Sequence, residues 1–432
     1  MELMIAAPPL ALPEDPADFA ALETRVQAWG QAVMRQALAA AFAAQEARLP
    51  VGLCPGCGGA AARPAGAKPR LVETVFGPVR LPRRPMRCGW CGRHRQPADP
   101  VLAAALGGGR LSPGLRDLAA LCGASWPYRQ AAEVLGRLRG EPPAHETGRA
   151  VVADIGAAVA AAGHAAAAAD CRGPARSRGP GRPAPARVEV ECDGAWLGCA
   201  EAPHGLEVKA GVVHAGGERV DRTRLRLVGR RYAATGRGVA ASAPLLTAAI
   251  EHVNGYAAPE QVWLGDGAGW IWRLGDDDLP AAAKVLGRWH LGQARRRALR
   301  AALPDKEARA PWSARLEDRP EVGDVPGALG ALAELAQEAP HPALAEFAAY
   351  LAGLAPRIPD YATRRAAGER VGSGGVEKAV DLVANRLLKG KRGMCWGRER
   401  VEGVVALRVA PLNREWDQHI PPALAAPELP AN

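Results

Sequence analysis

The sequence lacks long hydrophobic runs, a basic leader and a cysteine set typical of a disulfide framework. Its most apolar stretch, residues 150–169, is mostly Ala and carries Asp154 and His164, so it predicts a helix of a soluble protein and not a membrane span. The beginning of the chain has no basic segment followed by an apolar run, so we expect no signal peptide. These absences favour a cytoplasmic protein without a membrane partner.

The chain has nine cysteines, an odd number, and four of them form two C-x-x-C pairs. This usage is typical of a metal site in a reducing compartment. Hydrophobic residues make up 48% of the chain and charged residues 23%, which excludes a disordered chain. A length of 432 residues predicts several domains, since one domain usually takes roughly 100–200 residues.

The chain is basic, with a formal net charge of +10, and only seven of its 55 basic residues are Lys. Arg binds phosphate in a planar, bidentate manner, so this excess favours a nucleic-acid partner. A GC-rich genome would also raise Arg together with Gly, Pro and Ala, and the 50 Gly and 38 Pro fit that alternative. The charge alone therefore decides little.

A zinc ribbon is predicted over residues 51–100. Cys54-Pro-Gly-Cys57 and Cys88-Gly-Trp-Cys91 each present two thiolates, and together they complete a tetrahedral site for one structural zinc ion. Between them, two alternating runs flank Gly77-Pro78 and predict a hairpin. A redox pair is the alternative, but the motif occurs twice. His94 is a candidate additional ligand, but we favour its interpretation as a surface residue.

Helices are predicted on both sides of the ribbon, in residues 1–50 and 101–170. In the second region Ser112 caps a helix that stops at Gly123, Ser125 caps the next helix, and Gly140 ends it before a third. This order suits a helix-turn-helix DNA-binding region, and a plain helical bundle is the alternative. Residues 171–187 are rich in Pro, Gly and Arg and predict a basic linker, in which Arg182 belongs to a sequence like the core of an AT-hook, a minor-groove element.

Three carboxylates stand out in the last part of the chain. Predicted strands 187–192 and 261–265 run into Asp193-Gly194 and Asp266-Gly267, and two further strands (206–214 and 224–232) and a helix (244–256) lie between them. A later, last helix, starting near Ser373, carries Glu377 in or near its first turn, with Asp381 as the rival third acid. Strand ends of an α/β sheet are where sites are built. Three converging acids can hold two divalent ions, about 4 Å apart, that act on a phosphodiester.

Several sequence blocks resemble the DDE transposases of bacterial insertion sequences, closest to the ISKra-type and its ISLre-type relatives. The blocks are E-C-D-G-A-W (191–196), L-G-D-G-A-G-W-I-W (264–272), W-H-L (289–291), G-S-G-G-V-E (372–377) and R-G-M-C-W-G (392–397). The ribbon and its T-x-x-G-x-V-x-L hairpin (74–81) are also similar, so the likeness spans about residues 50–420.

The resemblance implies an RNase H-like catalytic core, a mixed sheet flanked by helices, over residues 188–432. In that family the first Asp lies on the first strand, the second Asp ends the fourth, and the Glu lies on a later helix. These positions correspond to Asp193, Asp266 and Glu377, which would hold two Mg²⁺ ions, with Mn²⁺ as a substitute. The helical pattern at about 291–370 corresponds to the all-α insertion that often precedes the Glu.

One position departs from the family. Related transposases carry Asp or Cys three residues before the His of the W-H block, and here Gly287 precedes His290. His290 is either a support of the active site or a structural residue. The departure would suit a copy with reduced activity, or a degenerate or domesticated copy that binds DNA without cutting it.

Further basic residues favour double-stranded DNA as the partner, both element ends and target, although each group could also be a solvated basic face. They are Arg295, Arg296 and Arg297 after His290, and Lys389, Lys391 and Arg392 after the Glu helix. Family logic implies a homo-oligomer on DNA. The Trp residues beside the acids favour core packing over base stacking. A glycosidase with paired carboxylates is a remote alternative, because it would need neither a ribbon nor a basic chain.

Overall fold

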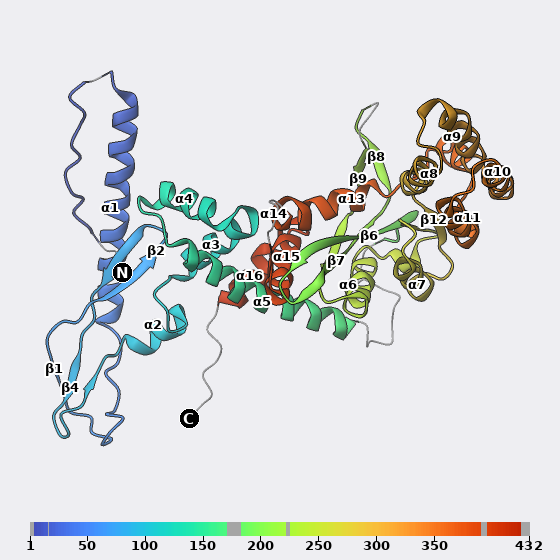
Figure 1. Cartoon of the computed structure of the whole chain (residues 1–432). Coiled ribbons are helices and arrows are strands. Elements are labelled where there is room, and N and C mark those ends of the chain that lie inside the picture. The colour runs from blue at the N-terminus through green and yellow to red at the C-terminus, as the bar shows by residue number, and fades with distance from the viewer. Residues whose placement is uncertain (1–3, 16, 171–182, 222–224, 390–394, 425–432) are drawn as a thin grey trace. The chain divides into compact units, whose positions relative to one another are not determined.

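The computed structural model describes residues 4–15, 17–170, 183–221, 225–389 and 395–424. The chain divides into two compact units, and each is described here by itself (Figure 1). Unit 1 comprises residues 1–159 and 415–432, and unit 2 comprises residues 160–414. Arg182, in the predicted linker, lies outside the described residues, as do Lys391 and Arg392.

Unit 1 begins with a long helix, α1 (Phe19–Glu46), as the sequence predicted. Its zinc-ribbon part contains a hairpin of β2 (Arg70–Thr74) and β3 (Gly77–Leu81), and a three-stranded sheet of β1 (Ala62–Pro64), β4 (Met86–Cys88) and β5 (His94–Arg95). The predicted hairpin is confirmed, but Gly77-Pro78 does not form its turn. Thr74 pairs with Gly77, so Val75 and Phe76 make the turn and Gly77 opens β3 with a φ of 100°.

The hairpin contributes to a small apolar core. Val72, Val79 and Leu81 pack against α2 (Asp99–Leu106), and Leu38 and Phe42 of α1 cover the same cluster. This packing follows from the alternation of the two strands, which turns every second side chain to one face. The ribbon is therefore anchored by a hydrophobic core as well as by its cysteines.

The predicted helices after the ribbon are present with shifted boundaries. They are α3 (Pro113–Ser125), α4 (Tyr128–Arg139) and α5 (His145–Asp170), and α16 (Trp416–Leu424) also belongs to unit 1. Ser112 caps α3 through the Leu115 amide at 3.2 Å, and Gly140 ends α4 in the left-handed conformation.

Two predicted helix signals in this region are wrong. Gly123 does not stop α3 but lies inside it, where an added Cβ would lie 2.5 Å from Val152 Cγ2 of α5. Ser125 ends α3 and does not cap α4, whose first position follows Pro127. Tertiary packing explains the glycine, because it lets two helices approach closely.

Unit 2 contains a five-stranded mixed sheet in the order β10-β7-β6-β11-β12. The central strand β6 is antiparallel to β7 and parallel to β11, which is in turn parallel to β12. The bounds are β6 (Arg187–Cys199), β7 (Ala202–His214), β10 (Arg231–Thr235), β11 (Glu260–Gly265) and β12 (Ala283–Leu286). The mixed α/β class predicted from the sequence is confirmed.

Three strand predictions need correction. β6 does not end at Cys192 but continues through Asp193 to Cys199, where a hairpin leads into β7. The predicted strand 224–232 is replaced by β10, while β9 (Leu225–Leu227) pairs with β8 (Gly217–Arg219) in a separate hairpin. β12 was not predicted. The predicted helix 244–256 is α6 (Val239–His252), followed by the short 3-10 helix η1 (Gly255–Ala257).

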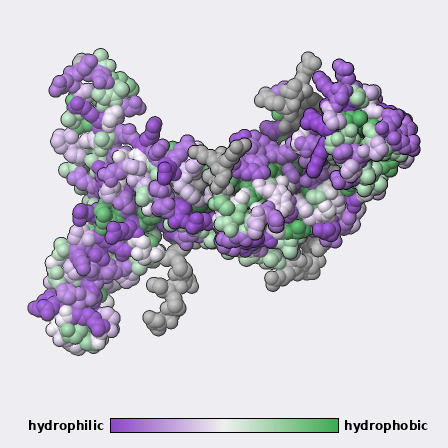
Figure 2. Space-filling model, in the orientation of Figure 1, coloured by the Kyte–Doolittle hydropathy of each residue, from purple (hydrophilic) through white to green (hydrophobic). Residues whose placement is uncertain are grey.

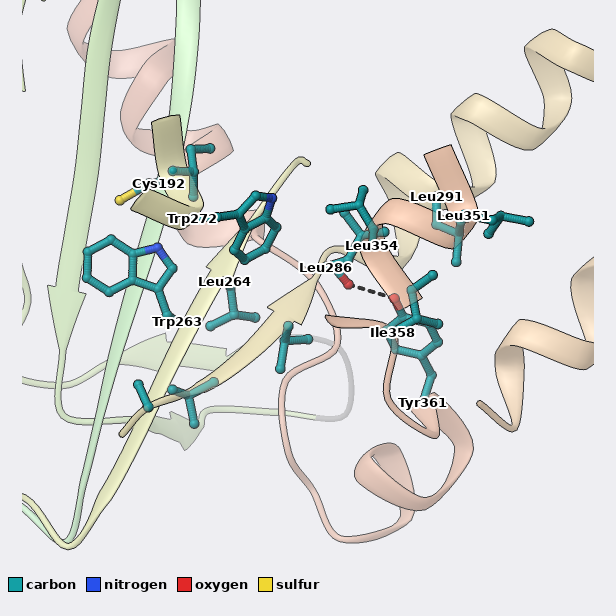
Figure 3. Close-up of a cluster of buried hydrophobic side chains, with 14 of the residues drawn as sticks. Cys192, Trp263, Leu264, Trp272, Leu286, Leu291, Leu351, Leu354, Ile358 and Tyr361 are labelled. Carbon is teal, nitrogen blue, oxygen red and sulfur yellow. Dashed lines mark hydrogen bonds between the residues drawn. The ribbon is translucent and has the colours of Figure 1, made fainter. Parts of the chain in front are cut away.

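One face of the sheet packs on α6 and on α7 (Gly269–Asp278). Val188, Val190 and Cys192 of β6 turn to this side, and an added Cβ at Gly211 of β7 would meet Leu246 of α6 at 2.3 Å. Figure 3 shows Cys192, Trp263 and Trp272 in this core, and the Tyr361 hydroxyl, which donates to the Leu286 carbonyl at 2.7 Å. The core therefore continues from the sheet into the helices that follow β12.

Those helices form the predicted all-helical segment. They are α8 (Arg288–Ala302), α9 (Lys306–Glu321), α10 (Val325–Glu338), α11 (Pro342–Leu354), η2 (Ala355–Arg357) and α12 (Tyr361–Ala366). α13 (Gly374–Val380) then continues through the π-helical turn η3 (Asp381–Asn385) into α14 (Arg386–Leu388). It is not the last helix, since α15 (Arg398–Leu412) follows in the same unit.

Candidate functional site

Asp193 lies in the middle of β6, opposite Ala210 of β7. It is half-buried, and its Oδ1 accepts the amide of Gly194 at 2.7 Å. Because side chains alternate along a strand, Asp193 shares its face of the sheet with Glu189 and Glu191, opposite the face that packs on α6. The sequence predicted the aspartate but not the extension of the strand beyond it.

Asp266 directly follows β11, as predicted. Its Oδ1 accepts the amide of Ala268 at 2.8 Å, which stabilises the turn into α7. Gly267 has a φ of 105°, and an added Cβ would lie 2.8 Å from the Tyr350 hydroxyl, so glycine is needed here. Burial and the negative charge of Asp266 raise the pKa of Tyr350 to about 12, so this tyrosine stays protonated at neutral pH.

Glu377 lies in the first turn of α13, and its side chain is 42% exposed. Its Oε1 is 3.7 Å from Nε2 of His290, which belongs to α8 and is mostly buried. The same Nε2 lies 3.3 Å from Ser373 Oγ, and the Trp289 ring meets the imidazole edge to face. Ser373 therefore orients His290 and makes no side-chain cap for α13.

Asp266 and Glu377 act electrostatically on Asp193. Burial and the charges of these two acids together raise the pKa of Asp193 to about 6, although the Gly194 amide and His290 oppose the shift. The fold therefore places Asp266 and Glu377 near enough to influence the charge of Asp193, but the ligand atoms of the three acids do not all lie within 4.8 Å of one another. The rival Asp381 differs: although desolvation opposes it, hydrogen bonds from Arg386 and Lys378 lower its pKa.

The chemistry of these three side chains suits a divalent cation. Three carboxylates supply the hard oxygen ligands that Mg²⁺ and Mn²⁺ prefer. The pKa of Asp193 is raised mainly by burial and also by the charges of Asp266 and Glu377, and a bound cation would favour its ionised form. Glu377 is the exposed edge of the group, so a substrate can reach it from solvent.

A second group of potential ligands lies deeper on the same face of β6. Ligand atoms of Glu189, Glu191 and His214 lie within 4.8 Å of one another, a spacing that could hold a metal ion. However, Arg370 donates to Glu191 Oε1 at 2.8 Å and lies 3.5 Å from Glu189 Oε2. A guanidinium therefore already compensates these carboxylates. The alternating sequence R-V-E-V-E-C-D is the signal that could have predicted their shared face.

The four ribbon cysteines come together as predicted, with all ligand atoms within 4.8 Å of one another. Cys54 Sγ is 3.5 Å from Cys91 Sγ, and Cys57 Sγ is 3.6 Å from Cys88 Sγ. Four sulfurs at about 2.3 Å from a central zinc would be about 3.8 Å apart, so the cluster could hold structural zinc after a small expansion. Backbone amides of Cys91 and Trp90 lower the pKa of Cys88 to about 6, which favours the thiolate. His94 is exposed and outside the cluster.

The predicted DNA-binding residues divide into two kinds. Arg295 is only 6% exposed and donates to Glu317 of α9 at 2.6 Å, so it joins two helices. Arg296, Arg297 and Lys389 are exposed and available to phosphates. Among the tryptophans beside the acids, Trp270 and Trp272 are core residues as expected, whereas Trp196 is 56% exposed.

Gly287 lies next to the acid group. An added Cβ would be 3.1 Å from His290 Cδ2 and 3.4 Å from Ser373 Oγ. An Asp or Cys side chain at this position would therefore contact His290 and Ser373. With glycine here, His290 has the Ser373 hydroxyl as its neighbour.

One described helix, α5, is long and apolar enough to cross a membrane by length and composition alone, and 39% of its most apolar window is buried. Its polar residues have partners, since Asp154 pairs with Arg116 at 2.5 Å and His164 with Glu402 at 2.7 Å. On the face drawn in Figure 2, hydrophilic residues predominate and hydrophobic ones are scattered. α5 therefore carries polar side chains that are paired within the fold.

Comparison of the chain with protein-family models and with curated proteins found no match.

Proposed function

We propose that this chain is an insertion-sequence transposase of the DDE type, with an RNase H-like catalytic core that cleaves DNA and transfers strands with the aid of metal ions. The observation that supports the proposal is that the charges of Asp266 and Glu377 both act on the half-buried carboxylate of Asp193. In chain order Asp193 lies on the first strand of the sheet and Asp266 follows the fourth. Glu377 lies on a later helix, after a helical insertion. This is the placement that the sequence resemblance implies.

In this function the three carboxylates hold two Mg²⁺ or Mn²⁺ ions, which would activate water and stabilise the leaving oxygen of a phosphodiester. Asp193 and Asp266 supply ligands from the rigid sheet, and Glu377 supplies one from α13. His290, held by Ser373, orients the Glu377 carboxylate. Attack of water on a phosphodiester at the element end would release a 3′-hydroxyl. This hydroxyl would then attack a phosphodiester of the target strand, where the new P–O bond forms as the target's own 3′-oxygen leaves.

The remaining parts of the chain would handle double-stranded DNA. The helices α3, α4 and α5 form the helix-turn-helix-like region, and the ribbon adds a zinc-dependent module. Exposed Arg296, Arg297 and Lys389 offer cations to phosphates. Two chemical steps at two element ends favour a homo-oligomer on DNA, in the cytoplasm.

The test is a cleavage assay with zinc-loaded protein, element-end DNA and Mg²⁺ or Mn²⁺. Asp193→Asn, Asp266→Asn and Glu377→Gln should each abolish cutting and retain DNA binding, because they remove ligands without changing shape. Asp381→Asn is the matched control, since this acid pairs with Arg386 and Lys378, and it should still cut. Cutting by Asp266→Asn, or cutting in excess EDTA, would reject the proposal.

A degenerate or domesticated protein that binds DNA without cutting is the second candidate, and Gly287 favours it. The position that carries Asp or Cys in the related proteins lies against His290 and Ser373, so its loss affects the neighbourhood of Glu377. Under this candidate, wild type binds element ends in a gel-shift assay but shows no cleavage. Gain of cleavage in Gly287→Asp would then identify the cause.

A further inference from the structure

Glu191 is a carboxylate with no exposed surface, two residues before Asp193 on β6. Its two oxygens have different partners. Oε2 accepts the backbone amide of Val376, in the first turn of α13, at 3.0 Å. Oε1 accepts Nη2 of Arg370 at 2.8 Å and lies 3.0 Å from Nε2 of His214. A buried carboxylate is costly unless it is hydrogen-bonded and paired, and here both conditions are met.

The contact with Val376 replaces a missing helix cap. The first amides of a helix lack acceptors within the helix, and a side chain at the N-cap usually supplies one. Ser373 stands at the N-cap of α13 but has no cap hydrogen bond. Its hydroxyl lies 3.3 Å from His290 instead. A strand residue, Glu191, therefore caps the helix from outside.

The close approach depends on a glycine. An added Cβ at Gly375 would lie 2.6 Å from Glu191 Oε1 and 2.9 Å from its Cδ. At the neighbouring Gly374, the nearest atom to an added Cβ is Arg370 Nη2 at 4.0 Å. The glycine at 375 thus allows α13 to sit directly on the carboxylate.

We propose that Glu191 is a positioning residue that sets the distance between Glu377 and Asp193 by capping α13. Val376, which it holds, directly precedes Glu377, and Glu191 and Asp193 belong to the same rigid strand. The inference rests on the proposed function, in which Asp193, Asp266 and Glu377 bind divalent ions. Glu191 would not be a ligand of that site, because its oxygens already contact Val376, Arg370 and His214.

The first test compares Glu191→Gln with Glu189→Gln in the full, zinc-loaded chain. An amide has one acceptor and one donor end, so Glu191→Gln must turn a donor toward either Val376 or Arg370. Glu189 is the matched control on the same face: it lies 3.5 Å from Arg370, and its Oε2 has no hydrogen-bond partner among the described residues. The control removes a neighbouring buried charge without touching the cap.

The second test approaches the same contact from the helix. Gly375→Ala pushes on the Glu191 carboxylate, whereas Gly374→Ala adds a methyl in open space. Ala has a higher helix propensity than Gly, by up to about 1 kcal/mol. Neither substitution should therefore destabilise α13 through helix propensity. This pair keeps the proposal testable if Glu191→Gln does not fold.

Two readouts are measured: Mn²⁺ binding by calorimetry, and hydrogen exchange of residues 371–380. We expect Glu191→Gln and Gly375→Ala to weaken Mn²⁺ binding about 10–100-fold, the usual effect of losing an outer contact of a metal site. Exchange at the start of α13 should rise in the same two variants. Glu189→Gln and Gly374→Ala should remain close to wild type in both.

The failures are distinguishable. A wild type that binds no Mn²⁺ refutes the proposed function, and the positioning role with it. If wild type binds Mn²⁺ and Glu377→Gln weakens binding, the proposed site stands. If Glu191→Gln and Gly375→Ala then bind Mn²⁺ with the same affinity as their controls, the positioning role alone is refuted. This holds whatever the hydrogen-exchange result.

Discussion

The carboxylate of Asp193 should make the metal-free protein less stable at neutral pH. Burial and the neighbouring acids raise its pKa from 3.8 to about 6 in the folded state. An acid with a raised folded pKa favours folding only while it is protonated. Its contribution is therefore fully present below about pH 4 and is lost as the pH rises through about 6.

The magnitude follows from the size of the shift. A shift of about two pKa units corresponds to about 3 kcal/mol at 1.36 kcal/mol per unit, and partial solvent exposure reduces this to about 1–3 kcal/mol. Asp193→Asn removes the charge and keeps the acceptor for the Gly194 amide. We expect the variant to be more stable than wild type by this amount above pH 7, and the difference to shrink below pH 5.

The assay is urea unfolding of zinc-loaded protein between pH 4 and 8, with no added divalent metal. Asp381→Asn is the control, because the pKa of this acid is lowered and its neutralisation should bring no gain. Saturating Mg²⁺ should stabilise wild type and not Asp193→Asn. Equal stability of Asp193→Asn and wild type at pH 7.5, or a difference that does not depend on pH, would refute the electrostatic reasoning.

Three further predictions concern the zinc site and the two cores. Cys57→Ser should unfold the ribbon and lower the zinc content, measured by atomic absorption, from about one ion per chain to none. Cys395 is exposed and outside the cluster, so Cys395→Ser should keep its zinc. Gly123→Ala should cost about 1–3 kcal/mol in thermal unfolding, because its Cβ would meet Val152 at 2.5 Å, while Gly163→Ala, with open space around it, should cost nothing. Tyr361→Phe should cost about 1–2 kcal/mol in urea unfolding, since it leaves the Leu286 carbonyl without its buried donor, and an unchanged midpoint would contradict that role.

Local patterns predicted the parts of the fold that local chemistry specifies. Each C-x-x-C pair forms its own tight turn, so the four-cysteine cluster followed from spacing. Ser112 and Gly140 mark helix ends because their side chain or backbone conformation acts within one turn. The aspartate after β11 was predictable for the same reason, since the strand ends where the buried run ends.

The wrong predictions concern segments whose structure depends on a partner far away in the sequence. Asp193-Gly194 resembles the end of a strand, yet β7 pairs with β6 through Cys199 and extends it. The run at 224–232 resembles one strand, but β8 pairs with its first part and β7 with the residues after it. Gly123 resembles a helix stop, and only the approach of α5 explains it as a packing residue.

The sequence by itself predicted the four-cysteine cluster, the mixed α/β class and the three acids worth testing. The alternation of R-V-E-V-E-C-D could also have placed Glu189, Glu191 and Asp193 on one face, but the strand was predicted to end before Asp193. Only the tertiary structure decided their different roles. Arg370, His214 and α13 surround the first two, whereas Asp193 meets the charges of Asp266 and Glu377. The energy of a charge interaction depends on the distance between the charges and on their burial. Neither quantity can be derived from the spacing of residues along the chain.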